Sequence, residues 1–242
     1  MALEPFADDW QRAVCVVAHP DDLEYGASVA VARWTEEGRT VVYVLATSGE
    51  AGIDHLSPDE CRRVRQREER AAAAAVGVDV VEFLDHPDGV VCYGLPLRRD
   101  LARAIRRHRP DFVLTANFSV TWGPGPGGPA NQADHRNVGL AALDASRDAG
   151  NRWVFPELLN EGLEPWGGTR WLAVFGSSTP THYASVEPRH LEAGVASLEA
   201  HEVYLSGLGQ EFDSRAFLTE QIRQSGASAL QELAVSFEVF TL

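Results

Sequence analysis

The chain has 242 residues, of which 21 are basic and 35 acidic, so its formal net charge is −14 at pH 7. This charge disfavours binding to nucleic acid or to an anionic membrane surface. Because 45% of the residues are hydrophobic, the chain can bury a substantial core, and we expect one domain over residues 1–242 with a small molecule as its partner.

Short β-branched runs alternate with helical stretches through the first two thirds of the chain. This alternation predicts βαβ units, and therefore an α/β fold with a mainly parallel sheet flanked by helices. The expected strands are residues 13–18, 40–46, 78–83 and 111–115. In such sheets ligands collect at the carboxyl ends of the strands, so we expect the active site there.

Helices are expected between these strands, at residues 23–37, 58–76 and 96–108. Ser57 and Glu60 have the N-cap and N3 positions that are typical of a helix start. Five arginines, with glutamates between them, lie on this second helix: Arg62, Arg63, Arg65, Arg67 and Arg70. We interpret them as part of a solvated helix face, because the glutamates counteract a basic patch.

The opening stretch MALEPFADDW lacks the basic and apolar regions of a secretory signal, and no apolar run reaches the roughly 18 residues of a membrane span. The cysteines Cys15, Cys61 and Cys92 are widely separated and lack the paired spacing of a zinc or redox motif. We therefore expect reduced, structural thiols in a cytoplasmic protein with no membrane partner.

The first expected strand leads directly into the polar stretch HPDDLEYG at residues 19–26. Helix capping is one interpretation, because Asp21 and Glu24 have the spacing of a capping box. That interpretation gives no role to His19 and Asp22. The same turn lacks the G-x-G-x-x-G pattern of dinucleotide-binding folds, which argues against a nucleotide-dependent oxidoreductase.

A metal site is the other interpretation of this stretch. A catalytic zinc takes about three protein ligands, and His nitrogen with Asp oxygen is an acceptable set. His19 and Asp22 lie within one turn, and His135 follows a glycine- and proline-rich loop, residues 122–129, near the end of another strand. From the residues alone, a metal site and ordinary packed or surface histidines are both open.

Several motifs occur in order along the chain: HPDDLEYG at 19–26, TSGEAG at 47–52, RQRE at 65–68, HPDG at 86–89 and ADHRNVG at 133–139. With PTHYASVE and SLEAHEVYLSGLG further on, they resemble the LmbE-like, or PIG-L, de-N-acetylases over most of the chain. The resemblance implies a Rossmann-like fold and the hydrolysis of N-acetyl groups from glucosamine-containing sugars or conjugates. It also implies a divalent metal, usually zinc.

The resemblance also implies roles for single residues. His19, Asp22 and His135 would hold the metal, in agreement with the ligand pattern described above. Asp21 would act as the general base that takes a proton from the attacking water. Asp134 would orient the loop or a metal ligand without binding the metal itself.

One position departs from the family pattern. Many members read His-Pro-Asp-His where this chain has Gln132 at the first of the four positions. A glutamine can donate a hydrogen bond to an oxyanion, but it cannot act as an acid. His182 and His201 are therefore candidates for the missing catalytic acid, and a packed, hydrogen-bonded histidine is the alternative for His201.

Three further residues match family positions that line the sugar site, namely Glu50, Arg65 and Asp88. We expect them to contact substrate, although a loop carboxylate, a surface arginine and a turn aspartate explain them equally well. The stretch from His86 to Asp88 resembles a second copy of the first motif, but it lacks the following aspartate and does not begin an evident helix, so we interpret His86 as loop structure.

The leading hypothesis is a zinc-dependent deacetylase that acts on an N-acetylated amino sugar or glycoconjugate. The alternative is a non-catalytic α/β protein that holds a metal or a sugar. We expect a single LmbE-like domain in which the part from about residue 150 forms a cover over the site and the final strand. The aromatic-rich segment 153–171 is expected to cover the site or to form a subunit interface of a homo-oligomer.

Overall fold

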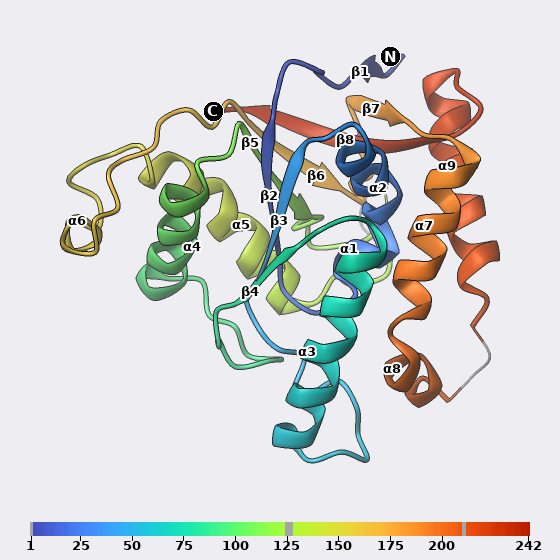
Figure 1. Cartoon of the computed structure of the whole chain (residues 1–242), viewed down its shortest axis with the longest axis horizontal. Coiled ribbons are helices and arrows are strands. Elements are labelled where there is room, and N and C mark those ends of the chain that lie inside the picture. The colour runs from blue at the N-terminus through green and yellow to red at the C-terminus, as the bar shows by residue number, and fades with distance from the viewer. Residues whose placement is uncertain (1, 124–127, 210–211) are drawn as a thin grey trace.

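The computed structural model describes residues 2–123, 128–209 and 212–242, which form one mixed sheet with helices on both faces (Figure 1). The strands are β1 (Glu4–Pro5), β2 (Arg12–Val17), β3 (Thr40–Leu45), β4 (Val80–Phe83), β5 (Phe112–Ala116), β6 (Trp171–Phe175), β7 (His182–Ser185) and β8 (Ala234–Thr241). The helices are α1 (Asp22–Gly26), α2 (Ser28–Glu36), α3 (Pro58–Ala75), α4 (Leu95–His108), α5 (Ala133–Asp148), α6 (Glu157–Asn160), α7 (Pro188–Glu199), α8 (Glu202–Gly207) and α9 (Ser214–Ala229).

The sheet has the order β1-β7-β8-β6-β5-β2-β3-β4. Strands β4, β3, β2, β5 and β6 are parallel to one another, and this order is that of a Rossmann-like half sheet. Strand β8 runs antiparallel between β6 and β7 and extends the sheet at the other side. The predicted α/β class with a mainly parallel sheet is confirmed.

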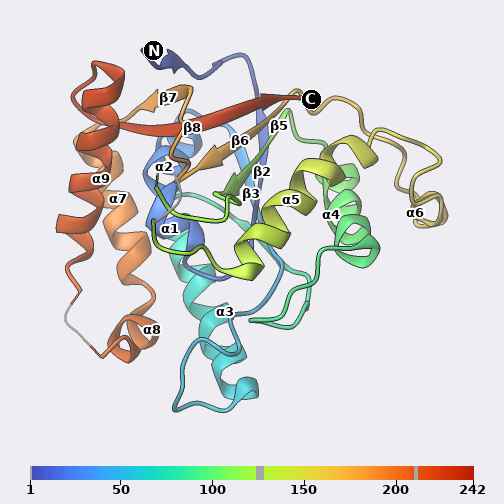
Figure 2. The ribbon, with the colours of Figure 1, turned by 180° about the vertical axis from the view of Figure 1, so that it is seen from behind.

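Helices cover both faces of the sheet, and each face has its own apolar core (Figures 1 and 2). Helices α4 and α5 pack on one face through residues such as Leu101, Ile105 and Val138. Helices α2, α7 and α9 pack on the other face through residues such as Val29 and Leu198. Because β2 and β5 are covered on both sides, they are continuous apolar runs rather than alternating ones.

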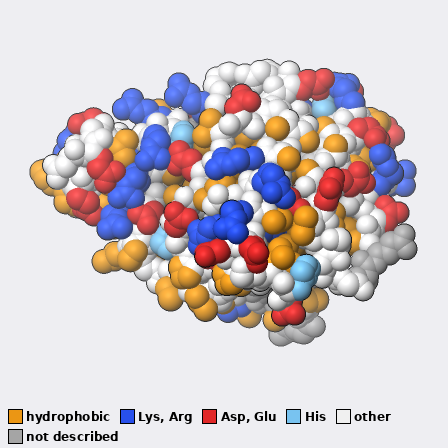
Figure 3. All heavy atoms as spheres, turned by 60° about the horizontal axis from the view of Figure 1, so that its bottom comes forward, with side chains coloured by type: hydrophobic (Ala, Val, Ile, Leu, Met, Phe, Trp, Pro, Cys, Tyr) orange, Lys and Arg blue, Asp and Glu red, His pale blue; other side chains and the backbone are white. Residues whose placement is uncertain are grey.

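Several surface charges form ion pairs. On the face shown in Figure 3, basic and acidic side chains are intermingled. On α4, for example, Arg98 pairs with Asp148, and Arg103 pairs with Glu161. No helix in the described part of the chain is both long and apolar enough to span a membrane.

The helix expected at residues 23–37 is interrupted in the structure. It is divided into α1 and α2 at Ala27, whose backbone leaves the helical region with φ −136°. The break brings Gly26 against the ring of Phe175 on β6, where a Cβ atom on Gly26 would lie only 2.2 Å from Cδ2 of the ring. The helix start predicted at Ser57 is confirmed, and the Glu60 carboxylate accepts the Ser57 N–H at 3.3 Å.

We expect Gly26→Ala to lower the free energy of unfolding by about 1–3 kcal/mol, because the added methyl group has to displace a buried aromatic ring. Gly207→Ala is the matched control, since its Cβ would meet Ile53 at an ordinary 3.7 Å and alanine favours a helix. Urea titrations of the two variants measure the difference. Equal stabilities would show that the contact between α1 and β6 does not constrain position 26.

Candidate active site

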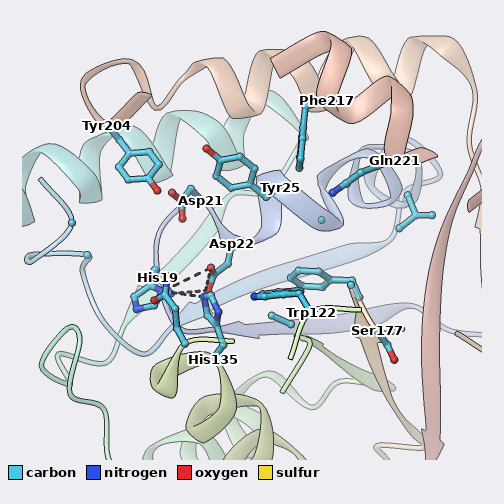
Figure 4. A pocket seen from close by; sticks show the side chains of 18 of the residues that line it. His19, Asp21, Asp22, Tyr25, Trp122, His135, Ser177, Tyr204, Phe217 and Gln221 are labelled. Atoms are coloured by element: carbon cyan, nitrogen blue, oxygen red, sulfur yellow. Dashed lines mark hydrogen bonds and ion pairs between the residues drawn. The ribbon is translucent and has the colours of Figure 1, made fainter. Parts of the chain in front are cut away.

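The carboxyl ends of the parallel strands meet at one edge of the sheet and line a cavity of about 910 Å³ (Figure 4). The chain order reverses between β2 and β5, and in open α/β sheets such a reversal leaves a crevice that ligands occupy. The loop after β2 carries His19, Asp21 and Asp22, and the loop after β5 leads to His135 on α5. The topology thus places these four residues together.

The side chains of His19, Asp22 and His135 converge in this cavity (Figure 4). His19 Nδ1 lies 3.2 Å from His135 Nε2. Asp22 Oδ1 lies 2.9 Å from His135 Nε2 and 3.8 Å from His19 Nδ1. The second Asp22 oxygen accepts the backbone N–H groups of Ala18 and His19, so the carboxylate is held in place by its own turn.

Asn131 determines which nitrogen of His135 faces the cluster. The Asn131 amide nitrogen donates to two backbone carbonyl groups, at 2.7 and 3.0 Å, so its Oδ1 is the acceptor that faces His135 Nδ1 at 2.9 Å. Nδ1 therefore carries the hydrogen. His135 Nε2 consequently presents a lone pair to the centre of the cluster.

Two carboxylates hold His19 from its other side. Its Nε2 lies 3.1 Å from Asp88 Oδ1 and 3.3 Å from Asp134 Oδ2, so this nitrogen carries a hydrogen and Nδ1 faces the cluster. Burial alone would lower the pKa of His19, but hydrogen bonds with Asp134, Asp22 and Asp88 raise it to about 12. The surrounding carboxylates thus favour a positive charge at this point.

This set of donors fits a divalent metal ion. The three ligand atoms of His19, Asp22 and His135 lie within 4.8 Å of one another, and two imidazole nitrogens with one carboxylate oxygen suit zinc. The second nitrogen of each imidazole is bonded to an amide or to carboxylates, as in zinc sites with oriented histidines. A proton on His19 Nδ1 can be shared with His135 Nε2 at 3.2 Å, and a cation bound between two neutral imidazoles would take the place of that proton.

Asp21 lines the cavity beside this cluster and has an unusual backbone conformation. Its φ of 88° lies in the left-handed region, which is strained for a residue other than glycine. Its N–H donates to Glu69 Oε2 at 3.2 Å, and its side chain caps no helix, so the capping interpretation is wrong. Burial raises the pKa of the Asp21 carboxyl, and the positive charge of Arg65 opposes that rise.

Arg65 is only 2% exposed, so the predicted solvated face of α3 is wrong at this position. Its Nη2 lies 3.1 Å from Asp21 Oδ2 and donates to the carbonyl of Pro20. The ring of Tyr204 covers the guanidinium, with its centroid 3.8 Å from Cζ. Glu68 on the same helix is buried as well, because α7 and α8 pack over this side of α3.

His201 is fully buried behind Arg65, at the point where α7 ends and α8 begins. Its Nδ1 accepts a hydrogen bond from Arg65 Nη1 at 3.3 Å, so its Nε2 carries the hydrogen. That nitrogen lies 3.7 Å from Glu24 Oε2 and 3.6 Å from Glu69 Oε2. Burial and the charge of Glu24 raise the pKa of Glu69 well above its usual range. His201 does not line the cavity.

Of the other residues that the sequence predicts for the site, some line the cavity and some do not. Asp88 and Gln132 line the cavity, and the Gln132 side chain has no hydrogen-bond partner among residues 2–123, 128–209 and 212–242. Glu50 lies one layer behind, where it accepts the Asp88 N–H and pairs with Arg62. His182 lies on β7 and does not line the cavity.

His86 forms an ion pair with Asp100 at 3.2 Å and does not line the cavity. In the predicted loop 122–129, residues 124–127 lie outside the described part of the chain, and Trp122 and Gly123 line the cavity. The aromatic segment 153–171 contributes no lining residue, and Trp153 is 78% exposed near α6. Residues of α8, α9 and β8 form the opposite wall instead.

Two aromatic residues near Asp21 were missed by sequence reasoning. The hydroxyl group of Tyr204 points toward the Asp21 carboxylate, and Tyr25 lies beside them (Figure 4). Burial and the charge of Asp21 raise the pKa of Tyr204 well above its usual range. Tyr204 belongs to the motif SLEAHEVYLSGLG, but no spacing rule connects that motif to the turn after β2.

Comparison with known proteins shows which family the chain resembles. Residues 14–146 match the model of the PIG-L family, described as GlcNAc-PI de-N-acetylase. The chain is 28% identical over 201 residues to the diacetylchitobiose deacetylase of Thermococcus kodakarensis, an alignment covering 82% of this chain and 72% of that protein. It is 39% identical over 262 residues to a 1D-myo-inositol 2-acetamido-2-deoxy-alpha-D-glucopyranoside deacetylase of a Nocardioides species, covering 84% of this chain and 86% of that protein.

The fold is also found in solved structures. The N,N'-diacetylchitobiose deacetylase of Pyrococcus horikoshii superposes with a TM-score of 0.81, over 96% of this chain and 84% of that one. The two sequences are 21% identical, so this likeness concerns the fold.

We expect Arg65→Gln to lower the free energy of unfolding by about 3 kcal/mol or more, because it leaves the buried Asp21 carboxylate without its opposite charge. Arg67→Gln is the control, since Arg67 is exposed on the same helix and its loss should cost less than about 0.5 kcal/mol. Denaturant unfolding of both variants measures the effect. Similar stabilities would contradict the ion pair as a determinant of this site.

Proposed function

The chain belongs to the PIG-L family of GlcNAc-PI de-N-acetylases, and from this premise we propose that it hydrolyses the N-acetyl group of an amino sugar or glycoconjugate. The observation that carries the proposal is the juxtaposition of the cluster of His19, Asp22 and His135 with buried Asp21 on one cavity. Relatives named for diacetylchitobiose and for an acetamido-glucopyranosyl inositol support N-acetylglucosamine-containing substrates.

We propose zinc as the metal, held by His19, Asp22 and His135, with another divalent ion as the alternative. When bound, such an ion supplies a Lewis acid that polarises the acetyl carbonyl and makes water more acidic. The chain's own contribution is to orient the ligands. Asn131 and Asp134 fix the two imidazole rings, and the turn after β2 fixes Asp22.

Asp21 is proposed as the group that moves the proton. It takes a proton from water as the water oxygen attacks the acetyl carbon, and it returns that proton to the nitrogen when the C–N bond breaks. The products are acetate and a free amine. Arg65 holds the Asp21 carboxylate in position, and His201, which does not line the cavity, acts through Arg65 as a positioning residue.

Gln132 is proposed to stabilise the oxyanion. It stands at the N-cap of α5, lines the cavity and has an amide free of partners in the described residues. An amide N–H can donate to the negative oxygen that forms on the acetyl carbon, although it cannot supply a proton. One proton-carrying group, Asp21, is then sufficient for the reaction.

The proposal is tested by measuring acetate release from N-acetylglucosamine and its neutral glycosides. Metal-loaded protein that releases no acetate from any of them would favour the alternative of a non-catalytic protein that binds metal or sugar.

We expect the purified chain to bind about one divalent ion, and His135→Ala to lose it, because the imidazole offers one of three ligand atoms. His86→Ala is the matched control, since His86 pairs with Asp100 away from the cluster. Elemental analysis after reconstitution with zinc measures both. Equal losses in the two variants, or no metal in the unmodified chain, would contradict the ligand assignment.

We expect Asp21→Asn to retain the metal and to lose two or more orders of magnitude in turnover, since an amide cannot take up the proton. The same change removes the negative charge that faces buried Arg65, so the free energy of unfolding should also fall. Acetate release, metal content and denaturant unfolding are measured on one preparation. A variant that loses the metal but keeps its rate when zinc is resupplied would make Asp21 a ligand instead of the base.

A further inference from the structure

The buried carboxylate of Asp21 receives positive charge from Arg65, but not a directed hydrogen bond. Arg65 Nη2 lies 3.1 Å from Asp21 Oδ2 and donates to the carbonyl of Pro20, whereas Nη1 donates to His201. In the described part of the chain, no donor meets Asp21 Oδ2 in hydrogen-bond geometry. The ion pair therefore keeps the carboxylate near Arg65, and rotation about its Cβ–Cγ bond is left for another group to restrict.

Asp21 differs from Asp22 in how its carboxylate is held. Asp22 accepts the backbone N–H groups of two residues in its own turn. Asp21 has a left-handed backbone with φ 88°, and its side chain does not cap α1. Its own N–H donates to Glu69 Oε2 at 3.2 Å, which fixes the main chain but not the carboxylate. The direction of the Asp21 side chain therefore depends on the helices that face it, α3 and α8.

The hydroxyl group of Tyr204 points toward this carboxylate (Figure 4). Tyr204 lies on α8, lines the cavity and is half-buried. Burial raises the pKa of its phenol, and the negative charge of Asp21 raises it further, so the phenol keeps its proton at neutral pH. A phenol with so high a pKa is a poor acid for the leaving amine. It can, however, donate a hydrogen bond to Asp21.

Helix α3 holds Tyr204 in place at two points. The Tyr204 ring lies over the Arg65 guanidinium, with 3.8 Å between the ring centroid and Cζ, which is the geometry of a cation–π contact. One turn further along α3, Glu68 Oε1 accepts the N–H of Val203, the residue before Tyr204, at 2.6 Å. Glu68 is 5% exposed, and a hydrogen bond from a backbone N–H to a buried carboxylate is strong. These two contacts fix α8 beside Asp21.

We propose that Tyr204 is a positioning residue whose hydroxyl group donates to the Asp21 carboxylate and fixes which Asp21 oxygen faces the attacking water. Glu68 acts through Tyr204, because it holds the backbone of α8. The inference rests on the proposed function, since it takes Asp21 to be the base. A base transfers a proton only within hydrogen-bond reach, and a carboxylate that rotates freely spends part of its time misaligned. Loss of the hydroxyl therefore lowers kcat rather than raising KM.

The first experiment uses Tyr204→Phe, which removes only the hydroxyl group and leaves the ring over Arg65. We expect kcat for acetate release from N-acetylglucosamine by the zinc-loaded chain to fall about tenfold or more. KM, zinc content and thermal unfolding should stay close to those of the unmodified chain. Tyr93→Phe is the matched control, since the Tyr93 hydroxyl also donates to an aspartate, Asp144, but lies outside the cavity lining. It should leave kcat and KM unchanged.

The second experiment tests whether Glu68 acts through Tyr204. We expect Glu68→Ala to lower kcat about fivefold, and Glu68→Gln to restore most of that loss because its amide oxygen still accepts the Val203 N–H. In the Tyr204→Phe background, Glu68→Ala should lower kcat less than twofold further, since no hydroxyl remains to be positioned. Thermal unfolding is measured because Glu68 also lies 3.7 Å from Arg65. If Glu68→Ala does not fold, the first experiment decides alone.

The outcomes separate this inference from the proposed function. A Tyr204→Phe variant with the kcat of the unmodified chain would overturn the inference while the deacetylase activity stands. A raised KM with unchanged kcat would overturn it too, because the hydroxyl group would then contact substrate instead of Asp21. Equal losses from Glu68→Ala in both backgrounds would overturn the role of Glu68. Absence of acetate from the unmodified, zinc-loaded chain would instead contradict the proposed function.

Discussion

Buried carboxylates at the end of β2 require positive charge, and the arrangement of the site follows from how that charge is supplied. Asp21 receives it from Arg65, which is itself buried on α3. Asp22 and Asp134 face the imidazole of His19, whose pKa they raise together with Asp88. Burying an unpaired charge in an apolar interior costs a large free energy, so these carboxylates lie beside positively charged groups. A divalent ion bound by this cluster would serve the same need as the proton on His19.

The parallel sheet makes this concentration of charge possible. Strands β2 and β5 are neighbours although about a hundred residues separate them, and their carboxyl ends open on the same crevice. Asp22 is held by the backbone of its own turn, whereas His135 is held by Asn131 on the loop that follows β5. The cluster is therefore assembled from the turn after β2 and the first turn of α5. The parallel pairing of β2 with β5 brings these two turns to the same edge of the sheet.

Much of this architecture could be predicted from the sequence, and the failures have physical causes. The alternation of strands and helices predicted the parallel sheet, and the motif at residues 19–26 predicted a cluster that includes His19 and Asp22. The position of Arg65 could not be predicted, because an arginine among glutamates on a helix reads as solvated unless the covering helices are known. The burial of His201 depends in the same way on the break between α7 and α8. Local sequence patterns identify the ends of the strands, whereas tertiary packing determines which charged side chains are buried.

The two walls of the cavity come from different parts of the chain. The PIG-L family model spans residues 14–146, which include His19, Asp22 and His135 together with Asp21 and Arg65. Phe217, Gln221 and Ser236 lie beyond that range, on α9 and on β8, the strand that joins the sheet in antiparallel orientation. The residues proposed for hydrolysis of the acetyl group therefore lie in the part of the chain that matches the family model. The residues of α9 and β8 that line the cavity lie outside that part, so they can differ between relatives without a change in the residues proposed for hydrolysis.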